Sequence, residues 1–244
     1  MMADRWAQAV RQQLGFGRLL PLGGPGDGAW ITEVAAVEAL RRSVAAVNGV
    51  RLGSLRLAPA DPDGSYTSVV PAPPSALAPG PLRIGAECAA TADEPLPRAA
   101  ARLREALAQA ARDGLGLVVA EVDLQVTALL DTDPEPARKP EKEESAEAPT
   151  EKSAPEGDEG RAARAAQGVA GVARLTGALG GLGRAVHIEE SAAPAALAHR
   201  HVRVELAVSS SHRALDVARA VREAVSTALT DGPSVAVLVT EVTP

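Results

Sequence analysis

The sequence predicts an α+β fold built from two tandem copies of one small module, each with the element order helix, strand, strand, helix, strand. The main observation is an internal repeat: residues Leu103–Leu124 align without gaps on Val221–Val242, with seven identical pairs. Alternating and helical apolar spacings recur in the same order in both halves. A Pro- and Glu-rich stretch, residues 131–160, separates the halves and predicts a linker.

Composition limits what the modules can be. The chain is 46% hydrophobic but only 2% aromatic, so its cores must be built from Ala, Val and Leu. The formal charge of −6 arises from residues 131–160, which hold 11 acidic and 4 basic residues. All three lysines, Lys139, Lys142 and Lys152, lie there as well. The predicted modules therefore contain no lysine, which excludes a Walker-type phosphate loop and Schiff-base chemistry from them.

The opening residues 1–27 and the first module, residues 28–130, are predicted from apolar spacing and from Gly and Pro signals. A short helix, Asp4–Leu14, is expected to lead into a flexible Gly-rich connection. Helical apolar spacing predicts the first helix of the module. A Pro-rich loop, residues 69–81, interrupts the strands. The elements predicted for this module are helix Glu33–Val47, strand Arg51–Ala58, strand Leu82–Ala90, helix Arg98–Arg112 and strand Leu115–Leu129.

The second module, residues 161–244, contains the clearest strand of the chain, because apolar residues alternate strictly from Val202 to Val208. Val235–Val242 is apolar on both faces and predicts a central strand. Ser210 or Ser211 is expected to cap the helix between these strands, and Asp231-Gly232 to end it. The other predicted elements are helix Ala162–Leu175, stopped by Gly180 and Gly181, and strand Arg184–Glu190.

The segments outside the modules predict compartment and chain behaviour. Residues 131–160 hold no apolar residue larger than Ala, so they are expected to stay disordered. The sequence contains no uninterrupted run of about 18 apolar residues, which is the minimum for a membrane-spanning helix. The N-terminus also lacks the apolar core of a signal peptide. A cytoplasmic protein, peripheral to the inner face of the membrane if it docks there, is expected. The single cysteine, Cys88, is expected to be a buried thiol.

The element order, the opening Trp30-Ile31-Thr32-Glu33-Val34 and the pairs Gly49-Val50 and Gly171-Val172 resemble the bacterial alkaline shock protein family, also called the envelope stress response family. The segment from Val217 to Val242 resembles that family's last helix and strand most. Residues 6–24 resemble uncharacterised bacterial proteins that carry a nucleopolyhedrovirus-type label, which implies no function. The family resemblance implies a non-enzymatic protein that self-associates or docks on a membrane-anchored partner. It implies no active-site residues.

No residue is predicted to be catalytic, to bind a cofactor or to hold a metal. His199 and His201 have a ligand-like spacing, but no Cys or carboxylate lies in register with them. The neighbours Glu189 and Glu190 point to opposite strand faces and cannot share a substrate. The run Ser209–His212 contains a nucleophile and a base, yet its place before a helix explains the serines as caps. His187 and His212 join no recognisable constellation.

Nucleic-acid binding is the alternative function, since Gly177–Gly183 includes the Gly-x-x-Gly pattern that KH-type RNA-binding modules place between helices. A helix end followed by a tight turn explains the same glycines. Two helices also carry basic residues, without the interleaved aromatic residues that stack on bases. A nucleic-acid partner is therefore not expected. The basic residues concerned are Arg98, Arg102, Arg104 and Arg112 in the first module and Arg213, Arg219 and Arg222 in the second.

Overall fold

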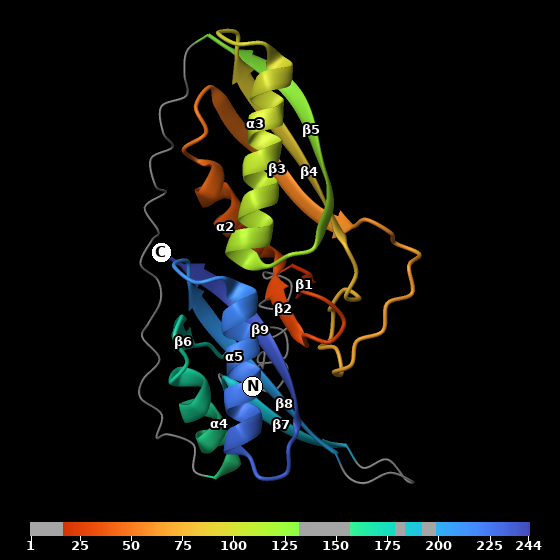
Figure 1. Ribbon diagram of the computed structural model, residues 1–244, viewed down its shortest axis with the longest axis vertical. Coiled ribbons are helices and arrows are strands. Elements are labelled where there is room, and N and C mark those ends of the chain that lie inside the picture. Colours follow the sequence, from red (N-terminus) through yellow and green to blue (C-terminus); the bar gives the residue numbers. More distant parts are fainter. Residues whose placement is uncertain (1–16, 132–156, 179–183, 192–198) are drawn as a thin grey trace, which may run out of the picture.

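The computed structural model describes residues 17–131, 157–178, 184–191 and 199–244, and in them the predicted α+β class is confirmed. The strands form two sheets, one of six strands and one of three, which follow one another along the long axis of the molecule (Figure 1). The predicted helix Asp4–Leu14, the predicted linker over residues 132–156 and the predicted stop signals Gly180 and Gly181 lie outside the described residues.

The first module forms the three-stranded sheet with the predicted element order. Its second strand pairs antiparallel with the first and parallel with the third, so the first and third strands are the edges. Thr32 caps the first helix, since its hydroxyl accepts a hydrogen bond from the Ala35 N–H (3.2 Å). The elements are α2 (Glu33–Val44), β3 (Val50–Pro59), β4 (Leu82–Thr91), α3 (Leu96–Gln109), a π-helical turn η1 (Ala110–Leu115) and β5 (Val119–Leu130).

The second module repeats this pairing scheme. Two short strands together take the place of β3, because both pair antiparallel with the long strand that corresponds to β4. That strand pairs parallel with the closing strand, as β4 does with β5. The elements are α4 (Asp158–Gln167), β6 (Val172–Leu175), β7 (Val186–Ser191), β8 (His199–Ser209), α5 (Ala214–Ala228) and β9 (Ser234–Thr243). The predicted duplication therefore extends to the sense of every strand pair.

The predicted helix Ala162–Leu175 is wrong in its second half. The helix α4 ends at Gln167, and Val172–Leu175 is strand β6. Gly171, with φ of 90°, turns the chain there, and a Cβ at this position would lie 2.6 Å from Val217 Cγ2. The apolar spacing of this segment is compatible with either structure, and pairing with β8 decides for the strand.

The predicted boundary at residue 160 between linker and second module is also wrong, because α4 begins at Asp158. Asp158 and Glu159 occupy its first turn, where negative side chains interact favourably with the positive end of the helix dipole. Asp158 also forms ion pairs with Arg161 and with Arg200 of β8, the latter at 2.6 Å. Acidic composition alone assigned these two residues to the linker.

The end of the repeat differs between the copies. In the second module, Gly232 has φ of 56° and lies in the turn after α5. Its counterpart Gly114 lies inside η1, and Gly116, with φ of 85°, ends that turn instead. Helical structure in the first module therefore extends to Leu115, beyond the predicted end at Arg112, and β5 starts four residues later than predicted. The gap-free sequence alignment hides this local shift.

Residues before the first helix of the first module join the sheet of the second. Leu19–Leu22 forms β1 and Ala29–Thr32 forms β2, so the connection predicted to be flexible contains a strand. The six-stranded sheet has the order β1-β2-β9-β8-β6, with β7 also on β8, and β2 pairs parallel with β9. Thr32 Oγ donates to the Thr240 carbonyl oxygen (3.3 Å), and Arg42 donates to that of Val242. The two modules are thus joined by main-chain pairing.

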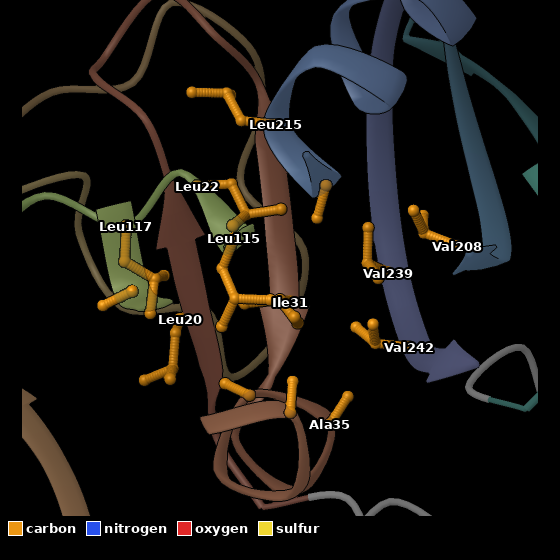
Figure 2. Packing of buried hydrophobic residues seen from close by; sticks show 14 of the residues in the cluster. Leu20, Leu22, Ile31, Ala35, Leu115, Leu117, Val208, Leu215, Val239 and Val242 are labelled. Atoms are coloured by element: carbon orange, nitrogen blue, oxygen red, sulfur yellow. The ribbon is translucent and has the colours of Figure 1, made fainter. Parts of the chain in front are cut away.

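One continuous hydrophobic core runs through both modules. Figure 2 shows Leu20 and Ile31 of the N-terminal strands beside Leu117 of the first module, with Leu215 and Val239 of the second module close by. All five side chains are buried. The junction between the modules is therefore part of the core.

The Pro-rich loop covers the second sheet, although its place in the sequence lies within the first module. A separate buried cluster contains Val70 of this loop, Trp30 of β2 and Leu238 of β9. The indole N–H of Trp30 donates to the carbonyl oxygen of Leu77 (3.4 Å). Leu238 alternates along β9 with the residues that face α5, so the loop covers the opposite face of the sheet.

Candidate interaction surface

The free edge of β5 is the most distinctive accessible feature of the described residues. β5 is the last strand of the three-stranded sheet and pairs only with β4 there, so the main-chain groups on its other side pair with no described strand, although the Val122 carbonyl oxygen accepts a hydrogen bond from Arg104. At 12 residues it is the longest strand among those described. Natural edge strands are usually protected by short length, charged side chains (Lys above all), Pro or β-bulges, because an open edge is a template for pairing with another chain. β5 contains neither Pro nor Lys.

Apolar side chains accompany this edge. Val126 is 36% exposed and Leu129 is 63% exposed, although both are in register with buried residues of β4, Cys88 and Ala90. The half of the strand from Gln125 to Leu130 carries no charged residue. The helix-facing side of β5 thus continues the apolar surface of the sheet beyond the cover that α3 supplies.

In the second module, the edge that corresponds to the free edge of β5 is paired with another strand. β9, the counterpart of β5, has β2 paired along its outer side, with Ala29, Trp30 and Ile31 in register with Val237, Leu238 and Val239. All six of these residues are buried. The same edge of the same module therefore accepts a strand in one copy and is open in the other.

The sequence did not single out this edge. The prediction identified a strand near residues 115–129 and could not tell whether it lies inside a sheet or at its margin. Its apolar spacing, its length and its lack of Lys and Pro were visible in the sequence. These features indicate an accessible edge only because β4 is the single strand that pairs with β5 among the described residues.

Two histidines of the second module, His187 and His201, make structural hydrogen bonds, whereas the side chain of His199 lies outside the described part of the structure. His201 Nδ1 is 2.8 Å from Ser234 Oγ, and the two residues are in register on β8 and β9. Glu189 of β7 is in register with His201 from the other side. His187 Nε2 is 3.0 Å from the Arg184 carbonyl oxygen. No cluster of three or more potential metal ligands occurs in the described part of the chain.

The predicted serine caps are wrong. The N-cap residue of α5 is Arg213, without a side-chain cap bond. The serines instead form a turn in which Ser209 Oγ is 2.8 Å from Ser211 Oγ, and Ser211 Oγ is 3.0 Å from His212 Nδ1. The Ser and His types that suggested a nucleophile and a base do meet, on an exposed turn whose hydrogen bonds account for both.

Two arginines of α3, Arg102 and Arg104, are engaged within the first module. Arg102 forms an ion pair with Glu94 and donates to the Asn48 carbonyl oxygen (2.7 Å). Arg104 donates to the carbonyl oxygen of Val122 in β5 (3.0 Å). These bonds tie the helix to the strands it covers.

The arginines of α5 connect this helix to other parts of the chain. Arg213 donates to the Arg112 carbonyl oxygen (2.9 Å), and Arg219 forms an ion pair with Asp27 (2.8 Å). Arg222 donates to the carbonyl oxygens of Val235 (3.0 Å) and of the segment before β2, including Gly26 (2.9 Å). Burial lowers the pKa of Arg222, although Asp27 nearby opposes this shift. The basic faces predicted from the sequence thus act mainly as internal clamps.

The two half-buried histidines predict a pH dependence of stability. Burial, with Arg203 nearby, lowers the pKa of His187 and of His201 below the ordinary value of 6.5. The unfolded chain therefore binds protons more readily than the folded chain just below this value, so stability is complete above pH 6.5 and decreases as the pH falls. We expect the urea midpoint to drop between pH about 7.5 and about 5.5.

The matched control is the double variant His187→Gln, His201→Gln, which should flatten this part of the pH profile. Carboxylates with lowered pKa, such as Asp27 beside Arg219 and Asp158 beside Arg200, titrate below their ordinary 3.8 and stay outside the window. An unchanged slope in the double variant would show that other groups cause the effect.

Cys88 is buried, as predicted, and burial raises the pKa of its thiol. Among the residues that the structure describes, no helix is both long enough and apolar enough to cross a membrane. Comparisons of the chain with protein-family models, with curated proteins and with solved structures found no match.

Proposed function

We propose that this chain is a non-enzymatic scaffold or interaction protein of the envelope stress type, which self-associates or docks on a membrane-anchored protein partner. The observation that carries the proposal is the free edge of β5 with its exposed apolar residues Val126 and Leu129. Addition of a strand to an open sheet edge is a recurrent way in which proteins bind other chains, since main-chain hydrogen bonds supply affinity and side chains supply specificity.

The polar side chains support the same proposal. The His, Ser and Arg residues that could have formed a reactive or phosphate-binding site make hydrogen bonds and ion pairs that position strands and helices, as in Arg222 and His201. The continuous core makes the two modules one body, which suits a protein that presents surfaces to others.

Light scattering of the full chain after size-exclusion chromatography, together with fractionation of stressed and unstressed cells, tests the proposal. We expect a mass of at least two chains, or an envelope fraction that grows under stress. A strictly monomeric chain that stays out of the envelope fraction in both conditions would refute it. A binding assay with single-stranded RNA at low salt adds a control: no salt-dependent binding is expected, because most arginines of α3 and of the α5 region, such as Arg102 and Arg213, are engaged within the chain.

A further inference from the structure

We propose that the occupant of the β5 edge is β5 of a second copy of this chain, paired antiparallel about a two-fold axis through Leu124. The two three-stranded sheets would then form one continuous six-stranded sheet. This inference rests on the proposed function, since it names the partner of the same edge. A two-fold interface brings one surface against itself, so the strand must be complementary to its own reverse.

The helix-facing side of β5 has this self-complementarity. Its members are identified by register, because they pair with the buried residues Leu82, Ile84, Ala86, Cys88 and Ala90 of β4. The five residues of β5 on this side are Val119, Val122, Leu124, Val126 and Leu129. Two pairs flank Leu124, one at two residues and one at five residues to either side. Every member is apolar, and the spacing reads the same in both directions.

The irregularities of β5 flank the same centre, one four residues before Leu124 and the other three residues after it. Ala120 is an extra residue between the register pairs of Val119 and Glu121, and Thr127 is another between those of Val126 and Ala128. One irregularity thus lies on each side of Leu124, and the pairing with β4 between them is regular. An antiparallel partner centred on Leu124 would meet a regular stretch at the centre and an irregular one at each end.

Charge disfavours the centres on the N-terminal side of Leu124. Directly opposed residues of an antiparallel pair lie on the same face of the sheet. The two-fold axis must therefore pass midway between one residue and the same residue of the other copy, and the axis is named here by that residue. An axis at Asp123 would place that carboxylate opposite its own copy, and an axis at Val122 would oppose Glu121 and Asp123, both of which are unfavourable. An axis at Leu124 places Asp123 opposite Gln125 and Glu121 opposite Thr127 instead.

The pairing also covers the exposed apolar groups. With the axis at Leu124, Val126 lies opposite Val122 of the other copy and Leu129 lies opposite Val119. The two most exposed members therefore meet two that α3 and β4 already cover better. β2 on β9 shows that the module accepts a neighbour at this edge without rearrangement of its sheet.

Disulfide cross-linking of the full chain tests the register. Leu124→Cys should form a covalent dimer under mild oxidation, because the axis brings the two cysteines face to face. Ala120→Cys and Ala128→Cys should each stay uncross-linked alone, since each lies about 26 Å from its own copy at ~3.3 Å per residue. A mixture of these two variants should cross-link. The wild-type chain, whose Cys88 is buried, should not.

A charge on the edge provides a second measurement that does not depend on cysteine. Val126→Lys should raise the dimer dissociation constant at least about tenfold, because the symmetry removes two apolar pairs at once. Val69→Lys is the matched control, since Val69 is exposed and lies on the Pro-rich loop. Circular dichroism checks that both variants fold.

The outcomes separate this inference from the proposed function. A wild-type dimer that Val126→Lys leaves intact, or that forms without a Leu124→Cys cross-link, overturns the β5 pairing while self-association stands. A monomeric wild-type chain with an envelope-bound partner also overturns the β5 pairing and leaves docking as the function. A monomeric chain without such a partner overturns both.

Discussion

Replacement of Gly116 by alanine is expected to lower the free energy of unfolding by about 2–4 kcal/mol, because it combines left-handed backbone strain with a collision in the core. Gly116 has φ of 85°, a conformation that alanine adopts at a cost. A Cβ there would lie 3.0 Å from Leu215 Cδ2 and closer still to Leu215 Cβ. Leu215 is buried in the first turn of α5, so the substitution acts on the junction between the modules.

Urea unfolding followed by circular dichroism measures this effect, and Gly114→Ala is its matched control. Gly114 lies two residues earlier in η1, has no positive φ, and a Cβ there would have no atom within 4 Å. Alanine at this helical position is expected to change stability little or to raise it by up to about 1 kcal/mol. Equal destabilisation by the two variants would contradict the conformational argument.

Replacement of Trp30 by alanine is expected to cost about 3–5 kcal/mol, the range for truncation of a large buried aromatic residue. Trp30 is 1% exposed and packs against Leu19, Val70 and Leu238. Trp30 is part of β2 and lies between the Pro-rich loop and the six-stranded sheet, so its removal would leave a cavity between them. The Leu77 carbonyl oxygen would also lose its donor.

The matched control for this variant is Val69→Ala. Val69 is 77% exposed next to the buried Val70, so its truncation should change stability by less than about 0.5 kcal/mol. Circular dichroism is the appropriate probe, because the Trp30 variant removes a fluorophore. A loss below about 1 kcal/mol for Trp30→Ala would show that the loop closes over the vacated space.

The spacing of apolar residues was sufficient to predict an element where that spacing is regular over many residues. The alternation from Val202 to Val208 predicted β8, and the doubly apolar Val235–Val242 predicted a central strand, which β9 is. In the first module, the predicted β4 ends one residue short of the observed strand. These elements have one face or both faces buried, and burial is what creates the pattern.

The spacing of apolar residues was insufficient where pairing or packing with a segment distant in the sequence decides the structure. Leu19–Leu22 is only four residues long, and it becomes a strand through β2, which β9 then stabilises from more than 200 residues away. β6 is equally short and depends on β8. The Pro-rich loop reads as exposed chain, yet Val70 is buried because the second sheet offers it an apolar face.

Some features of the β5 edge could likewise be predicted from the sequence, and others could not. The apolar residues from Val119 to Leu129 could be read from the sequence, and so could the missing Lys and Pro. Their symmetric spacing could not, because β4 defines which residues of β5 share a side and where the extra residues Ala120 and Thr127 fall.

The pairing of β2 with β9 has a consequence for the order of folding. During synthesis β2 leaves the ribosome early, while its partner strand follows only after both helices of each module have been made. Until then β2 and its bulky Trp30 lack their neighbour, and the contact they finally form closes a very long loop, which slows folding. A chain stalled before β9 would leave the outer edge of β2 unpaired. Quality control of this protein should therefore depend strongly on β9.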